Sequence, residues 1–112
     1  VCLWVDNYFK AVKILKLIGC EQKAYQETKR EMWKIDEVEI CIDEWPYLEP
    51  FLEIEADSEE KVKKVSKILN LDYSQAIFGS VDTLYSQKYN IPLKVINEQT
   101  ERITFDDDNP FV

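Results

Sequence analysis

The sequence lacks histidine entirely and has only two glycines and three cysteines among its 112 residues. Without imidazole, a general base or a metal site must use oxygen or sulfur ligands. Cys2, Cys20 and Cys41 form an odd number with no metal-ligand spacing, which is typical of reduced thiols in a cytoplasmic protein. No apolar run is long enough to span a bilayer, and no secretory signal pattern is visible. We therefore predict a soluble, cytoplasmic protein.

Basic residues are also scarce, since 14 Lys and Arg face 22 Asp and Glu, giving a net charge of −8. This balance argues against nonspecific binding to nucleic acid or to an anionic membrane. A phosphate-rich substrate would be repelled at long range and would need metal ions and a local basic patch. With 46% hydrophobic and 12% aromatic residues, the chain can bury a core, and residues 1–112 are expected to form one small domain.

Two stretches, residues 38–43 and 51–55, alternate between apolar and mostly acidic side chains and are separated by prolines. Successive side chains of a strand point to opposite faces, so the pattern predicts two neighbouring antiparallel strands. The carboxylates of Asp43, Glu53 and Glu55 then lie opposite the apolar face and can converge on one surface.

Two interpretations of these acids are open from spacing alone. Like charges a few ångströms apart repel, which raises a pKa or recruits a cation, and carboxylates suit Mg²⁺ or Mn²⁺. The alternative is an ordinary solvated face of an antiparallel sheet.

A third strand is predicted over residues 24–35, with Trp33 and Ile35 on its apolar face. Arg30 and Lys34 then point toward the same side as the acids. The planar guanidinium of Arg30 matches phosphate oxygens bidentately, and Lys34 would add a point charge. The alternative is that both cations simply neutralise the acidic cluster.

Apolar residues at helical spacing predict a helix over residues 8–18 capped by Asp6, one from Glu59 to about Asn70 after a capping box, and one from Ser80. Shorter elements are expected at a strand end over 1–5, a helical turn over 73–78, a strand or linker over 94–96, a strand over 103–105 and a frayed acidic tail over 106–108. The predicted fold class is α+β, an antiparallel sheet with helices packed outside it.

Residues 28–34 (TKREMWK), 38–46 (VEICIDEWP) and 51–55 (FLEIE) together resemble the second half of CYTH domains. This family of triphosphate tunnel metalloenzymes includes class IV adenylate cyclases, thiamine triphosphatases and inorganic triphosphatases. The order Arg…Asp-x-x-Pro…Glu-Ile-Glu, followed by an acid-capped helix, carries the resemblance. It implies that the chain is the C-terminal half of a CYTH domain and that its sheet is part of a tunnel-like barrel.

The resemblance also implies the roles of individual residues. Glu53 and Glu55 would bind Mg²⁺ or Mn²⁺, and Asp43 would be a further ligand or a catalytic group that positions water. Arg30 and Lys34 would grip a linear triphosphate such as tripolyphosphate, ATP or thiamine triphosphate. The ion would neutralise phosphate oxygens and assist attack at phosphorus.

The family's N-terminal Glu-x-Glu-x-Lys strand is missing, because Glu37-Val-Glu39 is followed by Ile40-Cys41. The leading hypothesis is a metal-dependent domain that hydrolyses or binds triphosphate. The alternatives are class IV adenylate cyclase-like activity, a noncatalytic polyphosphate-binding or structural module, and a divalent ion bound only for stability. Half a tunnel leaves strand edges unpaired, so a homodimer or a missing N-terminal segment is expected to complete it.

Overall fold

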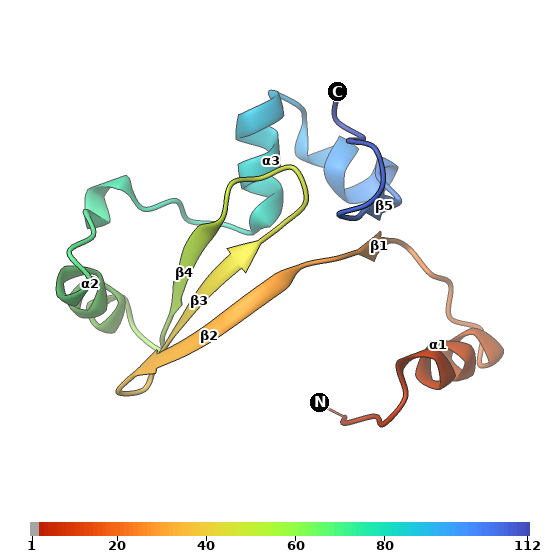
Figure 1. Ribbon diagram of the computed structural model, residues 1–112, viewed down its shortest axis with the longest axis horizontal. Coiled ribbons are helices and arrows are strands. Elements are labelled where there is room, and N and C mark those ends of the chain that lie inside the picture. Colours follow the sequence, from red (N-terminus) through yellow and green to blue (C-terminus); the bar gives the residue numbers. More distant parts are fainter. Residues whose placement is uncertain (1–2) are drawn as a thin grey trace.

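The computed structural model describes residues 3–112, which form a three-stranded antiparallel sheet and several short helices (Figure 1). This confirms the α+β class. In chain order the elements are α1 (Tyr8–Leu17), β1 (Tyr25–Gln26), β2 (Lys29–Ile35), β3 (Val38–Glu44), β4 (Phe51–Glu55), α2 (Glu59–Ile68), the 3₁₀ turn η1 (Tyr73–Gln75), α3 (Val81–Tyr89), the π-helical turn η2 (Val95–Gln99) and β5 (Arg102–Ile103).

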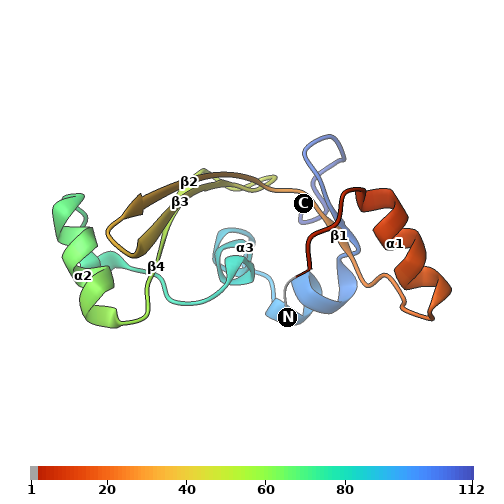
Figure 2. The same cartoon turned by 90° about the horizontal axis from the view of Figure 1, so that it is seen from below.

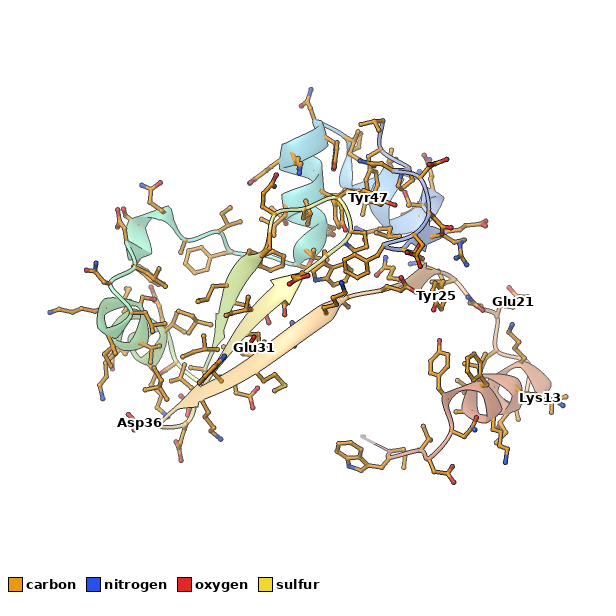
Figure 3. All side chains as sticks on the ribbon, viewed as in Figure 1. Lys13, Glu21, Tyr25, Glu31, Asp36 and Tyr47 are labelled. Atoms are coloured by element: carbon orange, nitrogen blue, oxygen red, sulfur yellow. The ribbon has the colours of Figure 1, made fainter. Side chains whose placement is uncertain are left out.

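The main sheet has the order β2-β3-β4, and both of its connections are antiparallel. A hairpin turn at Asp36-Glu37 joins β2 to β3, and Asp36 adopts a left-handed φ of 54° there, which Asp tolerates better than most residues. Figure 3 shows Asp36 at the tip of this hairpin. The longer connection from β3 to β4 contains Pro46 and Pro50, which therefore stay outside the hydrogen-bonded ladder.

Two separate hydrophobic cores are found within residues 3–112. In the first, Val38 and Ile40 of β3 pack against Val65 of α2, with Ile54 of β4 beside them. In the second, Tyr85 of α3 packs with Ile96 and Ile103. Figure 2 shows the sheet arching over α3, with α2 at one end of it.

A short parallel pair, β1 with β5, joins the segment before the sheet to the C-terminal region. It aligns Tyr25 with Arg102 and Gln26 with Ile103. Since Ile103 belongs to the second core, this pairing anchors the N-terminal part of the chain to that core.

The chain is much more open than a compact domain of its size. Its radius of gyration is 16.9 Å, whereas a compact domain of this length has roughly 13 Å. Helix α1 buries none of its residues, and Trp4 and Phe9 are 96% and 80% exposed. Within residues 3–112 the sheet does not close into a barrel. Large apolar surfaces therefore remain uncovered.

Several sequence expectations for local structure were wrong in detail. The strand predicted over residues 24–35 is interrupted after Gln26 and resumes at Lys29. The α1 cap is Asn7 rather than Asp6, because the Asn7 side chain accepts a 2.9 Å hydrogen bond from the Lys10 amide. Ser58 is the N-cap of α2 but makes no side-chain capping bond, so the capping box is not formed.

The remaining differences lie near the two ends of the chain, and tertiary burial explains one of them. Residues 94–96, expected to be extended, enter η2, because burial of Ile96 in the second core outweighs the local preference. The strand expected over 103–105 lies at Arg102–Ile103. The acidic tail is tied down, since Asp107 accepts a 2.9 Å hydrogen bond from Arg102. The strand end expected over residues 1–5 falls partly on Val1 and Cys2, which lie outside the described residues, and Leu3 to Val5 form no strand.

Candidate functional site

The candidate site is a face of the main sheet on which nine side chains form three rows across β2, β3 and β4. The registers place these residues directly opposite one another, and alternation puts them all on one side. We call this surface the charged face. Its rows are Arg30–Asp43–Phe51, Met32–Cys41–Glu53 and Lys34–Glu39–Glu55. All five residues predicted for the site therefore lie on one surface, as alternation had indicated.

Arg30 and Asp43 form the first contact on this face. Nε and Nη2 of Arg30 donate to the two carboxylate oxygens of Asp43 at 2.7 and 2.6 Å, so the pair is bidentate. The Asp43 side chain is 1% exposed, whereas that of Arg30 is 42% exposed. This hydrogen bond to Asp43 is the main reason that the pKa of Arg30 is raised above its usual value. Asp43 thus fixes the guanidinium plane, while the arginine remains open to solvent.

Glu53 joins the same pair from the neighbouring strand. Nη2 of Arg30 donates to Glu53 Oε1 at 3.2 Å, reaching diagonally across β3. Arg30 therefore lies between two carboxylates that β3 and β4 supply. Within residues 3–112 its Nη1 nitrogen has no hydrogen-bond acceptor from the protein, so it can still donate to a ligand.

The third row places Lys34, Glu39 and Glu55 side by side. Glu39 and Glu55 are directly opposite each other, an arrangement that is unfavourable unless a cation lies nearby. Lys34 is opposite Glu39 on its other side. In the described part of the chain Lys34 makes no ion pair within 4.0 Å. The alternation of residues 38–43 implies that Glu39 lies on this face, but its pairing with Glu55 depends on the register and was missed.

Cys41 is at the centre of the charged face, between Met32 and Glu53. It is 4% exposed, and burial raises the pKa of its thiol. The neighbouring Arg30 partly opposes that rise. The thiol is therefore protonated at neutral pH and is neither a nucleophile nor a ready metal ligand.

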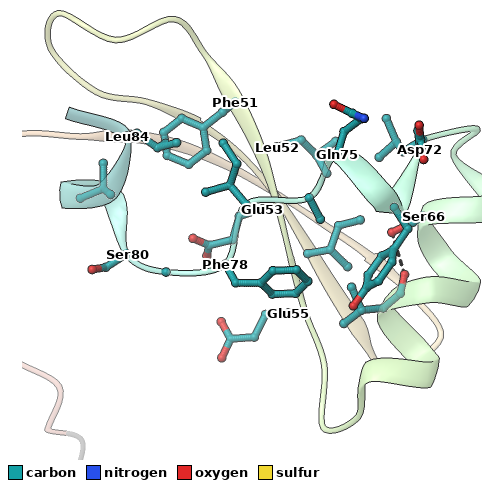
Figure 4. A pocket seen from close by; sticks show the side chains of 18 residues that line it. Phe51, Leu52, Glu53, Glu55, Ser66, Asp72, Gln75, Phe78, Ser80 and Leu84 are labelled. Carbon is teal, nitrogen blue, oxygen red and sulfur yellow. Dashed lines mark hydrogen bonds between the residues drawn. The ribbon is translucent and has the colours of Figure 1, made fainter. Parts of the chain in front are cut away.

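Carboxylate oxygens are suitable ligands for a hard divalent cation, but these carboxylates are not arranged as a complete binding site. Asp43 uses both oxygens on Arg30, which leaves Glu53 and Glu55 as the predicted ligands with open lone pairs. Figure 4 shows the carboxylates of Glu53 and Glu55 on the same side of β4. Across residues 3–112 no group of three or more acidic or cysteine side chains is arranged to hold a metal ion.

A groove runs along the outer edge of β4. It has a volume of about 790 Å³ and lies between β4 and a strap that leads from α2 to α3, residues 71–80 (Figure 4). All five β4 residues line it, so the groove borders the charged face through Glu53 and Glu55. Sequence reasoning did not find it, because it depends on the path of the strap.

Comparison of the chain with family models, with curated proteins and with solved structures gave no match. The helices in residues 3–112 are all too short or too polar to cross a membrane.

Proposed function

We propose that the charged face is part of a site for a triphosphate-containing small molecule, bound together with Mg²⁺ or Mn²⁺. One observation carries the proposal: a bidentate contact with buried Asp43 orients the guanidinium of Arg30 beside Glu53 while its Nη1 stays available. A guanidinium held in this way is suited to phosphate oxygens. Lys34, four residues further along β2 on the same face, supplies a second cation.

In this proposal the residues have different roles. Arg30 and Lys34 bind phosphate oxygens, and Asp43 orients Arg30, in place of the ligand role that the family resemblance implied. Glu53 and Glu55 hold the divalent ion, whose other ligands are phosphate oxygens and water. Mg²⁺ is commonly bound in this way, by one or two carboxylates plus substrate phosphates. When bound, the ion would neutralise phosphate charge, which offsets the repulsion expected from a chain of net charge −8.

We further propose that the chain is the C-terminal half of a CYTH-type tunnel and that the facing wall comes from a second copy or an N-terminal segment. The open sheet and the expanded radius of gyration support this. We favour hydrolysis of the triphosphate over adenylate cyclase-like conversion of ATP, which is the alternative within the family. The reason is that no residue of the charged face is assigned to recognition of the adenine base.

The competing proposal is a noncatalytic module, and the ion pairs themselves favour it. The positive charge of Arg30 is already paired with the carboxylates of Asp43 and Glu53, as expected if the arginine only neutralises these acids. A divalent cation that Glu53 and Glu55 bind only for stability would likewise have no catalytic role. Such a module would bind polyphosphate weakly or not at all.

The test is Mn²⁺-dependent turnover of tripolyphosphate and of ATP, with wild type beside the Glu53→Gln/Glu55→Gln double variant. We expect phosphate release that needs the ion and disappears in the double variant. Pyrophosphate released from ATP together with cyclic AMP would identify cyclase chemistry, whereas pyrophosphate with AMP would be hydrolysis at the α-phosphate. Lys61→Gln, on α2 and away from the charged face, is the matched control and should keep full activity.

Binding is measured separately, by isothermal titration of tripolyphosphate in the presence of Mn²⁺. An Arg30→Lys variant keeps the charge but loses the planar fork, so we expect about tenfold weaker binding. Binding without turnover would favour the noncatalytic module. Absence of both, even with a candidate N-terminal half supplied in trans, would overturn the proposal.

A further inference from the structure

The outer edge of β4 is unpaired, although the strand is well formed. Among the described residues, strand β4 pairs only with β3. In a strand with one neighbour, every second residue directs its backbone N–H and C=O outward. Within residues 3–112 no other backbone or side-chain group bonds to the backbone of Phe51–Glu55 from that side. The edge thus presents about 17 Å of open ladder.

The groove beside this edge is mainly apolar. Leu52 and Ile54 form its wall on the α2 side, and the strap contributes Ile77 and Phe78, which are 55% and 72% exposed. Large apolar side chains at the rim of an open backbone edge are typical of surfaces that another chain covers.

The charge of the groove specifies the chemistry of what can cover it. Its acidic residues are Glu53, Glu55 and Asp72, and none of the residues that line it is a lysine or an arginine. An acidic or neutral partner would leave Glu55, which has no ion pair in the described residues, uncompensated at the interface, and would leave Glu53 with only its contact to Arg30. A basic partner would neutralise them.

We infer that the β4 groove binds an extended peptide segment, which adds to the sheet as a fourth strand and alternates basic with apolar residues. The alternation follows from β4 itself. Side chains of an added strand that lie beside Glu53 and Glu55 are basic, and the intervening side chains, which lie beside Leu52 and Ile54, are apolar. Backbone bonds to the edge would supply affinity, and this pattern would supply specificity.

This inference goes beyond the proposed function, because it needs neither phosphate nor metal. The partner peptide would contact the outer side of β4, whereas Arg30 is on β2, at the opposite edge of the sheet. Glu53 and Glu55 belong to both proposals, so the peptide and the divalent ion would compete for them. The peptide needs neither Arg30 nor the ion, however, so triphosphate binding can fail while peptide binding holds, and the reverse.

The test uses a fluorescein-labelled peptide, Lys-Ile-Lys-Val-Arg-Val-Lys, titrated with the full chain and followed by fluorescence anisotropy without metal or phosphate. We expect saturable binding. The same peptide N-methylated at every internal residue keeps its charge but cannot donate backbone hydrogen bonds, and should bind at least about tenfold more weakly. A variant with Glu in place of every Lys and Arg should not bind.

Two protein variants locate the site. Phe78→Ala removes an exposed ring from the groove and should weaken binding about three- to tenfold. Leu17→Ala removes a similarly exposed apolar side chain, 76% exposed on α1, and should leave affinity unchanged. Hydrogen exchange should show new protection in residues 51–55 on binding.

Equal binding of the N-methylated peptide would overturn strand addition, because charge attraction alone would then explain the affinity. Equal loss in the Phe78 and Leu17 variants, or protection outside residues 51–55 only, would overturn the location. No saturable binding of the alternating peptide would overturn the inference as a whole.

Discussion

Arg30 and Asp43, directly opposite each other on β2 and β3, are joined by two hydrogen bonds although only Arg30 reaches solvent. A carboxylate that is 1% exposed depends on this arginine for its charge compensation. The pair thus links the stability of the sheet to the geometry of the candidate site.

Replacing Arg30 with Met should lower the free energy of unfolding by about 3 kcal/mol, because it leaves Asp43 buried without a partner. The estimate is at the low end for broken buried pairs, since Arg30 is partly exposed. Urea denaturation measures the change. Lys34→Met also replaces a cation with methionine, at a position that has no ion pair within residues 3–112, and should change stability by less than about 0.5 kcal/mol. Equal effects would contradict the special role of the Arg30–Asp43 pair.

Cys41 should make the protein less stable at alkaline pH. Burial raises the pKa of its thiol in the folded state, whereas in the unfolded chain it titrates near about 8.5. The stabilising contribution is therefore complete below about pH 8.5 and is lost as pH rises through the raised folded-state pKa.

The measurement is urea unfolding between pH 7 and 10, with Cys41→Ala as the comparison. The variant should lose less stability over this range than the wild type, while other groups titrate equally in both. Cys20→Ala changes an exposed thiol and is the control. Identical pH profiles for wild type and Cys41→Ala would refute the assignment.

Tyr85 joins α3 to the turn after β3. Its ring is fully buried, and its hydroxyl donates to the Pro46 carbonyl at 2.7 Å. Tyr85→Phe should lower stability by about 1–3 kcal/mol, because the buried carbonyl loses its only side-chain donor in the described residues. Tyr73→Phe removes a hydroxyl bonded to Glu59 at the surface and should cost less than about 0.5 kcal/mol. Thermal unfolding compares the two, and similar losses would count against the buried bond.

Gly79 is where the strap enters α3, and its φ of 143° disfavours other residues. A Cβ there would lie 2.7 Å from Oγ1 of Thr83. Gly79→Ala should therefore lower stability by about 1–2 kcal/mol. Adding Thr83→Ala removes the clash but not the backbone strain, so it should recover part of the loss. Full recovery in a double-mutant cycle would show that the backbone conformation is not strained.

Alternation of side chains made the centre of the fold predictable. The strands around Asp43 and Glu53, the turn at Asp36 and the helix from Glu59 follow from local patterns that tertiary contacts reinforce. The charged face was predictable for the same reason, since the period of two fixes which side chains share a side.

Features that depend on register or on distant packing could not be read from the sequence. The bidentate contact of Arg30 with Asp43, the pairing of Glu39 with Glu55 and the burial of Cys41 require the alignment of three strands. The turn at Ile96 is set by a core that forms from segments far apart in the chain. The tunnel itself, and the triphosphate proposed for it, stay predictions.

The parallel pairing of Tyr25 with Arg102 has a kinetic consequence. It closes most of the chain into one long loop through only two residue pairs, so that closure has a large entropic cost and little local compensation. Helix α1 depends on this junction, because it buries nothing of its own. The N-terminal arm should therefore detach in a sub-global opening while the main sheet stays folded, and its amides should exchange with solvent long before those of β3.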